Sequence, residues 1–258
     1  MPIPDRPRQP SADPRLNLLQ TDDHSWTLED KRSGDTFHSG CGAFAECRHV
    51  YLLNSDVAAR LDQQLPTSVL EIGFGFGLAF LTTAVKAIQS GTLLRYVATE
   101  ADPLHIDVMR QLAQLNGPRL GKDDASQGLC DHFLNFWMTE VCPRRPRARG
   151  WVSWDPRPQL PIVLQLWIGD RLDQAMQTES DQFDAIYFDP FSPASAAELW
   201  SDNYLRQVVA LLKRPAGKLV SYCVNSHVRR QLAALTLVAD RVPGPPGGKR
   251  EVLVAHFS

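Results

Sequence analysis

The residues with the clearest chemical potential belong to the sequence D-P-F-S-P, from Asp189 to Pro193, which follows a short apolar segment. The Asp189 carboxylate and the Pro190 carbonyl can accept hydrogen bonds from an amine and so aim its lone pair at a reacting partner. The ring of Phe191 can lie against the positive charge that grows on the nitrogen. Asp189 can also take a proton from the amine, directly or through water. These residue types predict a catalytic site for a reaction at an amine. The alternative is a D-P turn without a chemical role.

A second motif lies much earlier, where Val69 to Ile72 predicts a buried strand. Three glycines follow at alternate positions, Gly73, Gly75 and Gly77, and Glu71 precedes the first of them by two residues. Glycine lets the chain turn sharply at the end of a strand and brings bare backbone close to a ligand. The spacing E-x-G-x-G-x-G differs from the dinucleotide pattern G-x-G-x-x-G. It is the form in which methyltransferases that use S-adenosylmethionine (SAM) usually carry this turn. A tight strand-to-helix connection without a ligand is the alternative.

Two further acidic residues follow expected strands. Glu100 comes after a predicted strand from Leu93 to Thr99, about 20 residues beyond Gly77, which is the separation at which an acidic side chain accepts hydrogen bonds from a ribose diol. Asp170 comes after a predicted strand from Ile162 to Ile168 and can accept a hydrogen bond from an adenine amino group. Each acid can instead cap the helix that follows it. The order of strand, glycine turn and acid favours ribose binding for Glu100, and both roles can coexist for Asp170.

The elements that must position these residues alternate between strands and helices. Apolar spacing predicts helices at 55–64, 78–89, 103–115, 198–212 and 226–235, strands at 69–72, 93–99, 162–168, 183–188 and 218–224, and a closing hairpin of 235–242 with 251–257. This order predicts the α/β fold of class I SAM-dependent methyltransferases, with a Rossmann-like, seven-stranded, mostly parallel sheet containing one reversed strand. Parallel strands end at one edge of a sheet, so the motifs are expected to converge there. In this topology the D-P-F-S-P turn lies beside the glycine turn, which favours its functional interpretation.

The amino-terminal sequence is expected to stand apart from this domain. Residues 1–24 are polar and rich in proline and predict a disordered lead-in. Residues 25–66 are expected to form an arm that packs on the catalytic domain, with a β-hairpin turning at Ser33-Gly34. The SAM-dependent methyltransferase domain is then expected to span 67–258.

The most basic and aromatic stretch of the chain lies in an insertion at about 121–160. It contains five arginines and two tryptophans: Arg144, Arg145, Arg147, Arg149, Arg157, Trp151 and Trp154. Arginines neutralise phosphates and indoles stack on unpaired bases, which allows nucleic-acid contact. A solvated loop whose tryptophans pack on the protein body explains the same residues equally well. The net charge of −2 means that any nucleic-acid surface must be a local patch.

Composition excludes several other classes. The 258 residues, 43% of them hydrophobic, can bury one full core. The five cysteines form no C-x-x-C pair and the histidines are not clustered, so a reducing cytoplasm is expected and a metal site is not. The amino terminus lacks the apolar core of a signal peptide. The longest apolar region, Val69 to Ile88, contains Glu71, Lys86 and three glycines, which argues against a membrane span.

At this level of detail the sequence resembles the methyltransferase domain of the MnmC/MnmD group, which acts on the wobble uridine of bacterial tRNA. The resemblance runs from about Ser25 to the carboxyl terminus. The matching segments are E-C-R-H-V-Y-L from Glu46, E-I-G-F-G-F-G-L-A-F-L from Glu71, L-W-I-G-D from Leu166, F-D-A-I-Y-F-D-P-F-S-P from Phe183, E-L-W from Glu198, H-V-R-R-Q-L from His227 and G-K-R-E-V-L from Gly248. The D-P-F-S-P and K-R-E pieces are far more diagnostic than the glycines.

The resemblance implies SAM as methyl donor and the aminomethyl group of wobble uridine as acceptor, converting nm5(s2)U34 to mnm5(s2)U34 in tRNA. The candidate cofactor-binding residues are Glu71, Gly73, Gly75, Gly77, Glu100, Asp170 and Asp189. It also implies an upstream enzyme that supplies the aminomethyl uridine. Candidate contacts to the tRNA anticodon region are Arg229, Arg230, Lys249, Arg250, Arg144 and Arg145. Two-domain members carry a flavin-dependent oxidase after the methyltransferase, and this chain ends at Ser258, so flavin activity is not expected. At one place the sequence departs from the group: Val224-Asn225-Ser226-His227 replaces the small residues that usually precede V-R-R.

Two other functions fit parts of the pattern. One is a methyltransferase or aminopropyltransferase acting on a small amine, whose substrate binding would not depend on salt, whereas tRNA binding would weaken steeply as salt rises. The other is a non-catalytic RNA-binding relative, which would not bind SAM. The presence together of Glu71, Glu100, Asp170 and Asp189 argues against that second alternative.

Overall fold

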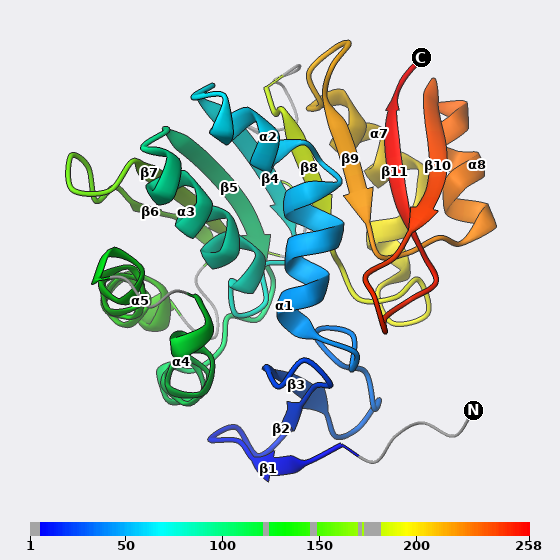
Figure 1. Ribbon diagram of the computed structural model, residues 1–258. Helices are drawn as coiled ribbons and strands as arrows, with labels where there is room; N and C mark the ends of the chain where they lie inside the picture. The colour runs from blue at the N-terminus through cyan, green and yellow to red at the C-terminus, as the bar shows by residue number, and fades with distance from the viewer. Residues whose placement is uncertain (1–5, 121–123, 145–148, 170–171, 173–181) are drawn as a thin grey trace.

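The computed structural model describes residues 6–120, 124–144, 149–169, 172 and 182–258. Its main sheet has eight strands in the order β10-β11-β9-β8-β4-β5-β7-β6 (Figure 1). The strands are β4 (Thr67–Ile72), β5 (Leu94–Glu100), β6 (Gly150–Trp154), β7 (Ile162–Ile168), β8 (Ala185–Phe188), β9 (Lys218–Ser221), β10 (Leu237–Pro243) and β11 (Glu251–Phe257). Strands β7, β5, β4, β8 and β9 are parallel neighbours, and β11 is antiparallel to both β9 and β10. The predicted class I methyltransferase fold is confirmed.

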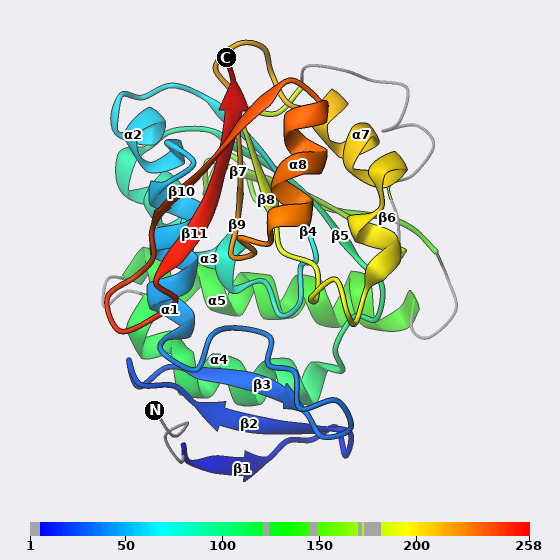
Figure 2. The same cartoon turned by 90° about the vertical axis from the view of Figure 1, so that its right-hand side faces the viewer.

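Helices cover both faces of this sheet (Figure 2). The α-helices are α1 (Ala43–Glu46), α2 (Val57–Asp62), α3 (Leu78–Ser90), α4 (Ile106–Leu120), α5 (Asp124–Phe136), α7 (Asp202–Ala210) and α8 (Ser226–Ala234), and the shorter or wider turns are η1 (Cys47–Leu53), η2 (Trp137–Val141), η3 (Cys142–Arg144) and η4 (Ala197–Trp200). In Figure 2 the sheet separates α2 and α3 from α7 and α8. Val69 of β4 belongs to the apolar cluster under α3, and its neighbour Leu70 belongs to the cluster under α7 and α8. A strand buried on both faces explains the unbroken apolar sequence that predicted it.

The seven strands of the predicted sheet are all present, and the insertion adds β6 as an eighth. Strand β6 pairs antiparallel with β7 at the edge of the sheet, so the sheet has a second reversed strand. Its Trp151 ring lies 5.4 Å from the Trp167 ring, and its Trp154 ring stacks 5.9 Å from the Phe136 ring, measured between centroids. The two tryptophans therefore pack on the protein body, which is the second of the interpretations given for the insertion.

The amino-terminal segment forms a small sheet of its own. Strands β1 (Arg8–Pro10), β2 (Leu16–Gln20) and β3 (Trp26–Asp30) pair antiparallel and lie beyond the carboxyl ends of the central strands (Figures 1 and 2). The prediction of a disordered lead-in over 1–24 is therefore wrong for residues 6–24. The reason is that Leu16 and Leu18 are buried together with Leu28 of β3, a pairing that the proline-rich composition does not reveal. The predicted turn at Ser33-Gly34 is present as a bridge between Glu29 and Thr36.

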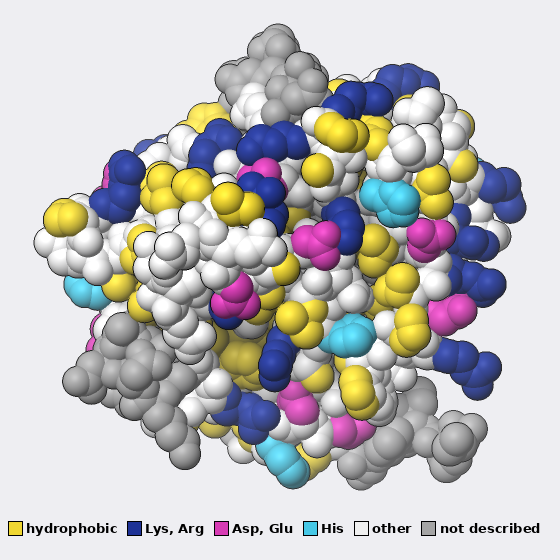
Figure 3. Space-filling view, turned by 45° about the horizontal axis from the view of Figure 1, so that its top comes forward, with side chains coloured by type: hydrophobic (Ala, Val, Ile, Leu, Met, Phe, Trp, Pro, Cys, Tyr) yellow, Lys and Arg dark blue, Asp and Glu magenta, His cyan; other side chains and the backbone are white. Residues whose placement is uncertain are grey.

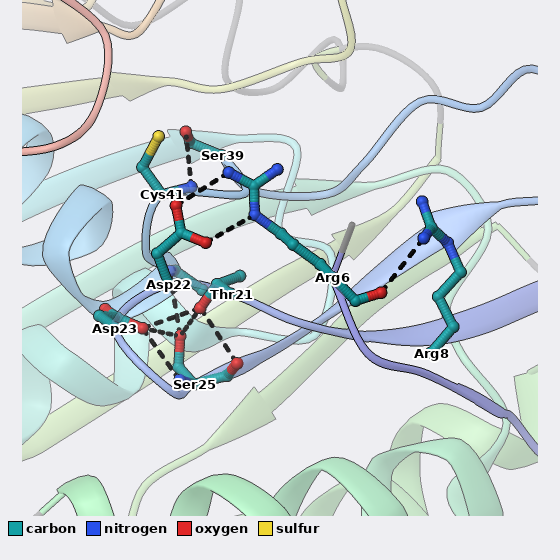
Figure 4. Close-up of polar contacts among 9 residues, drawn as sticks. Arg6, Arg8, Thr21, Asp22, Asp23, Ser25, Ser39 and Cys41 are labelled. Atoms are coloured by element: carbon teal, nitrogen blue, oxygen red, sulfur yellow. Dashed lines mark hydrogen bonds and ion pairs between the residues drawn. The ribbon is translucent and has the colours of Figure 1, made fainter. Parts of the chain in front are cut away.

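A hydrogen-bond network joins this small sheet to α1 (Figure 4). The Thr21 hydroxyl donates to the Asp23 carboxylate, and the backbone N–H of Ala45 donates to the other oxygen of that carboxylate at 3.0 Å. The Ser25 hydroxyl oxygen accepts from the N–H of Ala43 at 3.0 Å. These side chains satisfy free N–H groups at the start of a helix that has no cap of its own. The network fixes the direction of α1 and of η1, which continues it.

His38 of the arm leads to a prediction about pH. Its Nδ1 lies 3.1 Å from the Thr27 hydroxyl oxygen, and its ring centroid lies 5.0 Å from that of Phe76. Burial lowers the pKa of His38 from 6.5 to about 4, against the opposing charge of Asp23. Because the folded-state pKa lies below the unfolded one, the stability contributed by the neutral ring is full above pH 6.5 and is lost as the pH falls toward 4.

When the pH falls from 7.5 to 5, we expect the wild type to lose about 2 kcal/mol of unfolding free energy relative to His38→Gln. Urea denaturation of both proteins at the two pH values measures it. The comparison cancels other titrating groups, which are common to both proteins. The exposed His132→Gln is the matched control and should show no such change. A pH-independent difference for His38→Gln would contradict the burial argument.

Candidate active site

A cavity of about 640 Å³ lies between the carboxyl ends of the central strands and the amino-terminal arm. Eight residues singled out from the sequence line it: Glu71, Gly73, Gly75, Glu100, Asp189, Pro190, Phe191 and Lys249. The arm contributes Phe37, His38 and Ser39 to the opposite wall, and α1 contributes Glu46. The motifs that were expected to converge at one edge of the sheet thus share one cavity.

The glycine turn and Glu100 form one end of the site. One carboxylate oxygen of Glu100 accepts from the N–H of Gly75 at 2.7 Å, and the other accepts from the N–H of Asp102 at 2.8 Å. Each oxygen keeps a lone pair that can accept from a ligand hydroxyl. Burial raises the pKa of Glu100, and these two backbone donors oppose that rise. The geometry therefore suits the recognition of a diol.

The glycines themselves have different surroundings. Gly73, Gly75 and Gly77 all have positive φ, at 88°, 57° and 77°. A Cβ on Gly73 would lie 2.6 Å from the carbonyl oxygen of Asp189, so the glycine turn and the D-P-F-S-P turn are in direct backbone contact. Gly77 is not part of the cavity lining; it precedes α3, and a Cβ there would lie 2.8 Å from the Phe74 ring. Its requirement for glycine comes from packing.

The D-P-F-S-P turn is held by three side-chain donors. The Tyr51 hydroxyl donates to Oδ1 of Asp189. The Tyr222 hydroxyl donates to the Pro190 carbonyl at 3.0 Å, and Nε1 of Trp200 donates to the Phe191 carbonyl at 2.7 Å. The Pro190 carbonyl thus keeps one lone pair for another donor.

The Phe191 side chain lies at the mouth of this site. Its ring is 42% exposed and makes an edge-to-face contact with Phe37 of the arm, with 5.3 Å between the ring centroids. An aromatic face left this open can receive a substrate group that enters from outside.

The cavity is rich in carboxylates. Burial raises the pKa of Asp189 well above its ordinary value, and the charge of Glu46 raises it further, whereas the Tyr51 hydrogen bond and Lys249 lower it. Burial also raises the pKa of Glu71, with a further contribution from Asp189, and the Tyr96 hydroxyl, which donates to Glu71 at 2.9 Å, opposes it. A positively charged ligand would relieve both effects. The electrostatics therefore favour a cationic ligand or substrate.

The predicted tRNA contacts are not all at the cavity. Lys249 lines it, with Nζ 4.1 Å from the centroid of the Tyr222 ring. Arg230 and Arg250 are exposed outside it, and Arg229 and Arg144 are half-buried outside it. Three further residues singled out from the sequence, Asp170, Arg145 and Arg147, lie outside the described residues. Gly169, which precedes Asp170, lines the cavity.

Basic side chains at the opposite end of the molecule are largely paired. Figure 3 shows this end, with lysines and arginines among acidic and hydrophobic side chains and along the side on which α8 and β10 lie. Arg60 and Lys213 both contact the Asp184 carboxylate, at 3.0 and 3.1 Å, and Lys218 contacts Asp56. These cations already have partners, so the basic residues nearer the cavity are the better candidates for phosphate contact.

The sequence interpretation did not assign a role to several residues of the site. Glu46 and Tyr51 come from α1 and η1, Phe37 comes from the arm, and Tyr222 follows β9. The signal that could have found the first two is the segment E-C-R-H-V-Y-L, where polar residues interrupt the apolar face of a helix.

In the described part of the chain, no helix is both long and apolar enough for a membrane span. The same residues contain no group of three or more His, Cys, Asp or Glu side chains arranged to hold a metal ion.

Comparison with known families gives a match over residues 156–258 to the model of the S-adenosyl-L-methionine-dependent methyltransferases. Those residues include the D-P-F-S-P turn and the closing hairpin. SAM is thus the cofactor of this family, and the residues around Glu100 and the glycine turn fit its ribose and its positive charge.

Among curated proteins, the chain is similar to "tRNA 5-methylaminomethyl-2-thiouridine biosynthesis bifunctional protein MnmC". The protein from Delftia acidovorans is 34% identical over 236 residues, covering 88% of this chain and 33% of the relative. The protein from Aromatoleum aromaticum is 32% identical over 222 residues, covering 84% and 32%. The chain thus spans about a third of the length of these relatives.

Among solved structures, MnmC2 from Aquifex aeolicus superposes with a TM-score of 0.71 at 19% identity, covering 97% of this chain and 71% of that one. At this identity the likeness supports the fold. Its coverage includes the amino-terminal segment as well as the sheet.

Proposed function

Because residues 156–258 match the model of the S-adenosyl-L-methionine-dependent methyltransferases and the chain is similar to MnmC proteins over most of its length, we propose that it methylates the aminomethyl group of wobble uridine in tRNA. The product would be the 5-methylaminomethyl uridine, with or without sulfur at position two. The observation that carries this proposal is the shared cavity in which the D-P-F-S-P turn touches the glycine turn. A turn for an amine and a turn for a cofactor in contact are what methyl transfer to nitrogen requires.

The cofactor half of the site is assigned to the glycine turn and Glu100. SAM supplies an electrophilic methyl group when it is bound. Glu100 would accept from its ribose hydroxyls, and the backbone of Gly73 and Gly75 would lie against it. The neighbouring carboxylate of Glu71 would stabilise its positive charge.

The substrate half is assigned to Asp189, Pro190 and Phe191. The Asp189 carboxylate, held by Tyr51, and the remaining lone pair of the Pro190 carbonyl would accept from the N–H groups of the amine. Two fixed acceptors leave the nitrogen lone pair one direction in which to point. The exposed Phe191 ring would cover the nitrogen as its charge grows.

The partner proposed for this site is the anticodon region of tRNA. Anticodon bases are unpaired or easily splayed, so a uridine can enter the cavity at small unstacking cost. Phosphate contacts are assigned to Lys249 and Arg250 beside the cavity and to Arg229, Arg230 and Arg144 farther away. The proposal places the protein in the cytoplasm, downstream of an enzyme that makes the aminomethyl uridine.

The direct experiment is mass spectrometry of tRNA nucleosides from cells with and without this gene. Loss of the gene should remove the methylated nucleoside and accumulate its aminomethyl precursor. Purified protein with SAM should then methylate that tRNA, with binding that weakens steeply as salt rises. An unchanged nucleoside profile together with no methyl transfer in vitro would refute the proposal.

Glu100→Gln tests the cofactor half separately. The amide keeps one acceptor oxygen but replaces the other with a donor that opposes the N–H of Gly75 or Asp102. SAM affinity should fall by about 10- to 100-fold, or about 1.4–2.8 kcal/mol. Isothermal titration calorimetry measures it, and Asp107→Gln, an exposed site on α4, is a control that should bind normally. Wild-type affinity for Glu100→Gln would remove Glu100 from the cofactor site.

A further inference from the structure

Glu46 is a buried acid that the proposed function has not yet used. It ends α1, is 4% exposed and lines the same cavity as Asp189. Its Oε2 accepts from the N–H of Ser39 at 3.1 Å. A carboxylate held inside a protein is costly unless it is compensated, so its retention at the wall of a substrate cavity requires an explanation.

The groups that face Glu46 come from four elements. Asp189 follows β8 and Lys249 lies between β10 and β11, and each interacts electrostatically with Glu46. Tyr51 of η1 and Tyr222 after β9 also experience its charge, as does its neighbour Cys47. Two carboxylates and one ammonium therefore meet at the acceptor side of the cavity.

Asp189 and Glu46 differ in how they are bound. Asp189 Oδ1 accepts from the Tyr51 hydroxyl, which fixes the position of the carboxylate and opposes only part of the rise in its pKa that burial and Glu46 cause. Glu46 accepts from the backbone N–H of Ser39. It ends a helix whose start is fixed by Asp23 and Ser25, which are drawn in Figure 4. The first residue suits positioning, and the second suits proton exchange.

We propose that Glu46 accepts the proton that the substrate ammonium must lose before methyl transfer, while Asp189, held by the Tyr51 hydroxyl, orients the resulting amine. This inference rests on the proposed function, because it requires an aliphatic amine as acceptor. Such amines are protonated at neutral pH, and a protonated nitrogen has no lone pair to receive a methyl group.

The proton step balances without a further reactant. One N–H bond of the ammonium breaks, its electron pair stays on nitrogen, and the proton forms an O–H bond to a carboxylate oxygen of Glu46. The nitrogen lone pair of the neutral amine then forms a bond to the methyl carbon as the methyl–sulfur bond of bound SAM breaks, with the electron pair of that bond going to sulfur, and the product leaves as a secondary ammonium. Glu46 returns its proton to solvent through the open cavity.

The proton affinity of Glu46 suits this task. Burial raises the pKa of Glu46 to about 7, and Lys249 and the Ser39 N–H limit the rise. The group is therefore largely ionised and able to accept above pH 7, and it is protonated and inactive below. The wild-type kcat/KM should rise with pH up to about 7 and then level off.

Glu46→Gln tests the inference with an isosteric side chain. At pH 7.5 its kcat should fall by about 100-fold or more, the lower end of the usual range for a general base. Its rate should continue to rise above pH 7, because solution hydroxide and the amine's own ionisation then set the rate. Glu46→Asp keeps a carboxylate and should retain the plateau at a lower rate. Glu140→Gln makes the same change at an exposed position outside the cavity and should keep the wild-type profile.

Folding and cofactor binding are measured alongside by circular dichroism and by SAM calorimetry, and both should match the wild type. A Glu46→Gln enzyme with a wild-type plateau and rate would overturn the inference while leaving the proposed function intact. A wild-type enzyme that does not methylate aminomethyl-uridine tRNA would overturn the proposed function itself. If Glu46→Gln does not fold, Glu46→Asp decides: a pH profile without the plateau near pH 7 would overturn the inference.

Discussion

Replacing Asp189 with alanine should reduce methyl transfer by at least about 1,000-fold while SAM binding is retained. The change removes the carboxylate that the Tyr51 hydroxyl holds in place, so the amine loses its orientation. Glu46 would then be the remaining carboxylate on the acceptor side of the cavity. The substitution leaves Glu100, Gly73 and Gly75 unchanged. Single-turnover kinetics with aminomethyl-uridine tRNA measure the loss, and calorimetry measures SAM binding.

Two companion variants sharpen the Asp189 result. Asp189→Asn keeps an oxygen that can accept from Tyr51 and should fall between the wild type and Asp189→Ala. Tyr51→Phe keeps the carboxylate but frees it, and should lower kcat by about 10-fold with little change in SAM affinity. Turnover of Asp189→Ala at the wild-type rate would refute its catalytic role. A large loss of SAM affinity would instead move Asp189 to the cofactor half, for which the sequence also proposes it.

Gly73→Ala should have the second-largest effect, acting on the cofactor and on stability together. Its φ of +88° is strained for any residue with a Cβ. The added Cβ would also lie 2.6 Å from the carbonyl oxygen of Asp189 and 3.2 Å from Cα of Pro190, both backbone atoms that cannot rotate away. We expect a loss of about 3 kcal/mol or more in unfolding free energy and at least about a 100-fold loss in SAM affinity.

Gly91→Ala is the matched control for Gly73→Ala. Gly91 ends α3 with a φ of +65°, but a Cβ there meets nothing within 4 Å. Only the backbone strain remains, so its cost should be about 1–2 kcal/mol, with SAM affinity unchanged. Thermal unfolding and calorimetry compare the two variants. Equal effects at both positions would mean that the contact between the two turns has no functional weight.

Three of the site residues that sequence reasoning identified lie where a parallel strand ends. Gly73, Glu100 and Asp189 are fixed by strand ends, and parallel strands bring their ends to one edge whatever the helices do. Local pattern was therefore sufficient for these residues. The local spacing of apolar residues was likewise sufficient to predict the order of the helices and strands.

The other wall of the cavity could not be obtained in this way. Glu46 reaches the cavity, and Tyr51 reaches Asp189, because α1 and η1 lie across the ends of the strands. That placement depends on Asp23 and Ser25 of a separate sheet. The prediction of a disordered lead-in was wrong for residues 6–24 for a related reason. Strands β1 and β2 are stabilised by pairing and not by local propensity. Strand β6 has the same origin: five residues of an arginine-rich stretch pair because β7 offers a free edge.

The way the arm is attached also bears on how the protein acquires activity during synthesis. The arm leaves the ribosome first, yet its contacts join distant parts of the chain. Trp26 bonds to Asn116 across 90 residues, Tyr51 to Asp189 across 138, and His49 to the Pro243 carbonyl across 194. Contacts of such separation close late and slowly. During translation, Glu46 and Tyr51 are therefore made long before Asp189, which the Tyr51 hydroxyl contacts, has emerged.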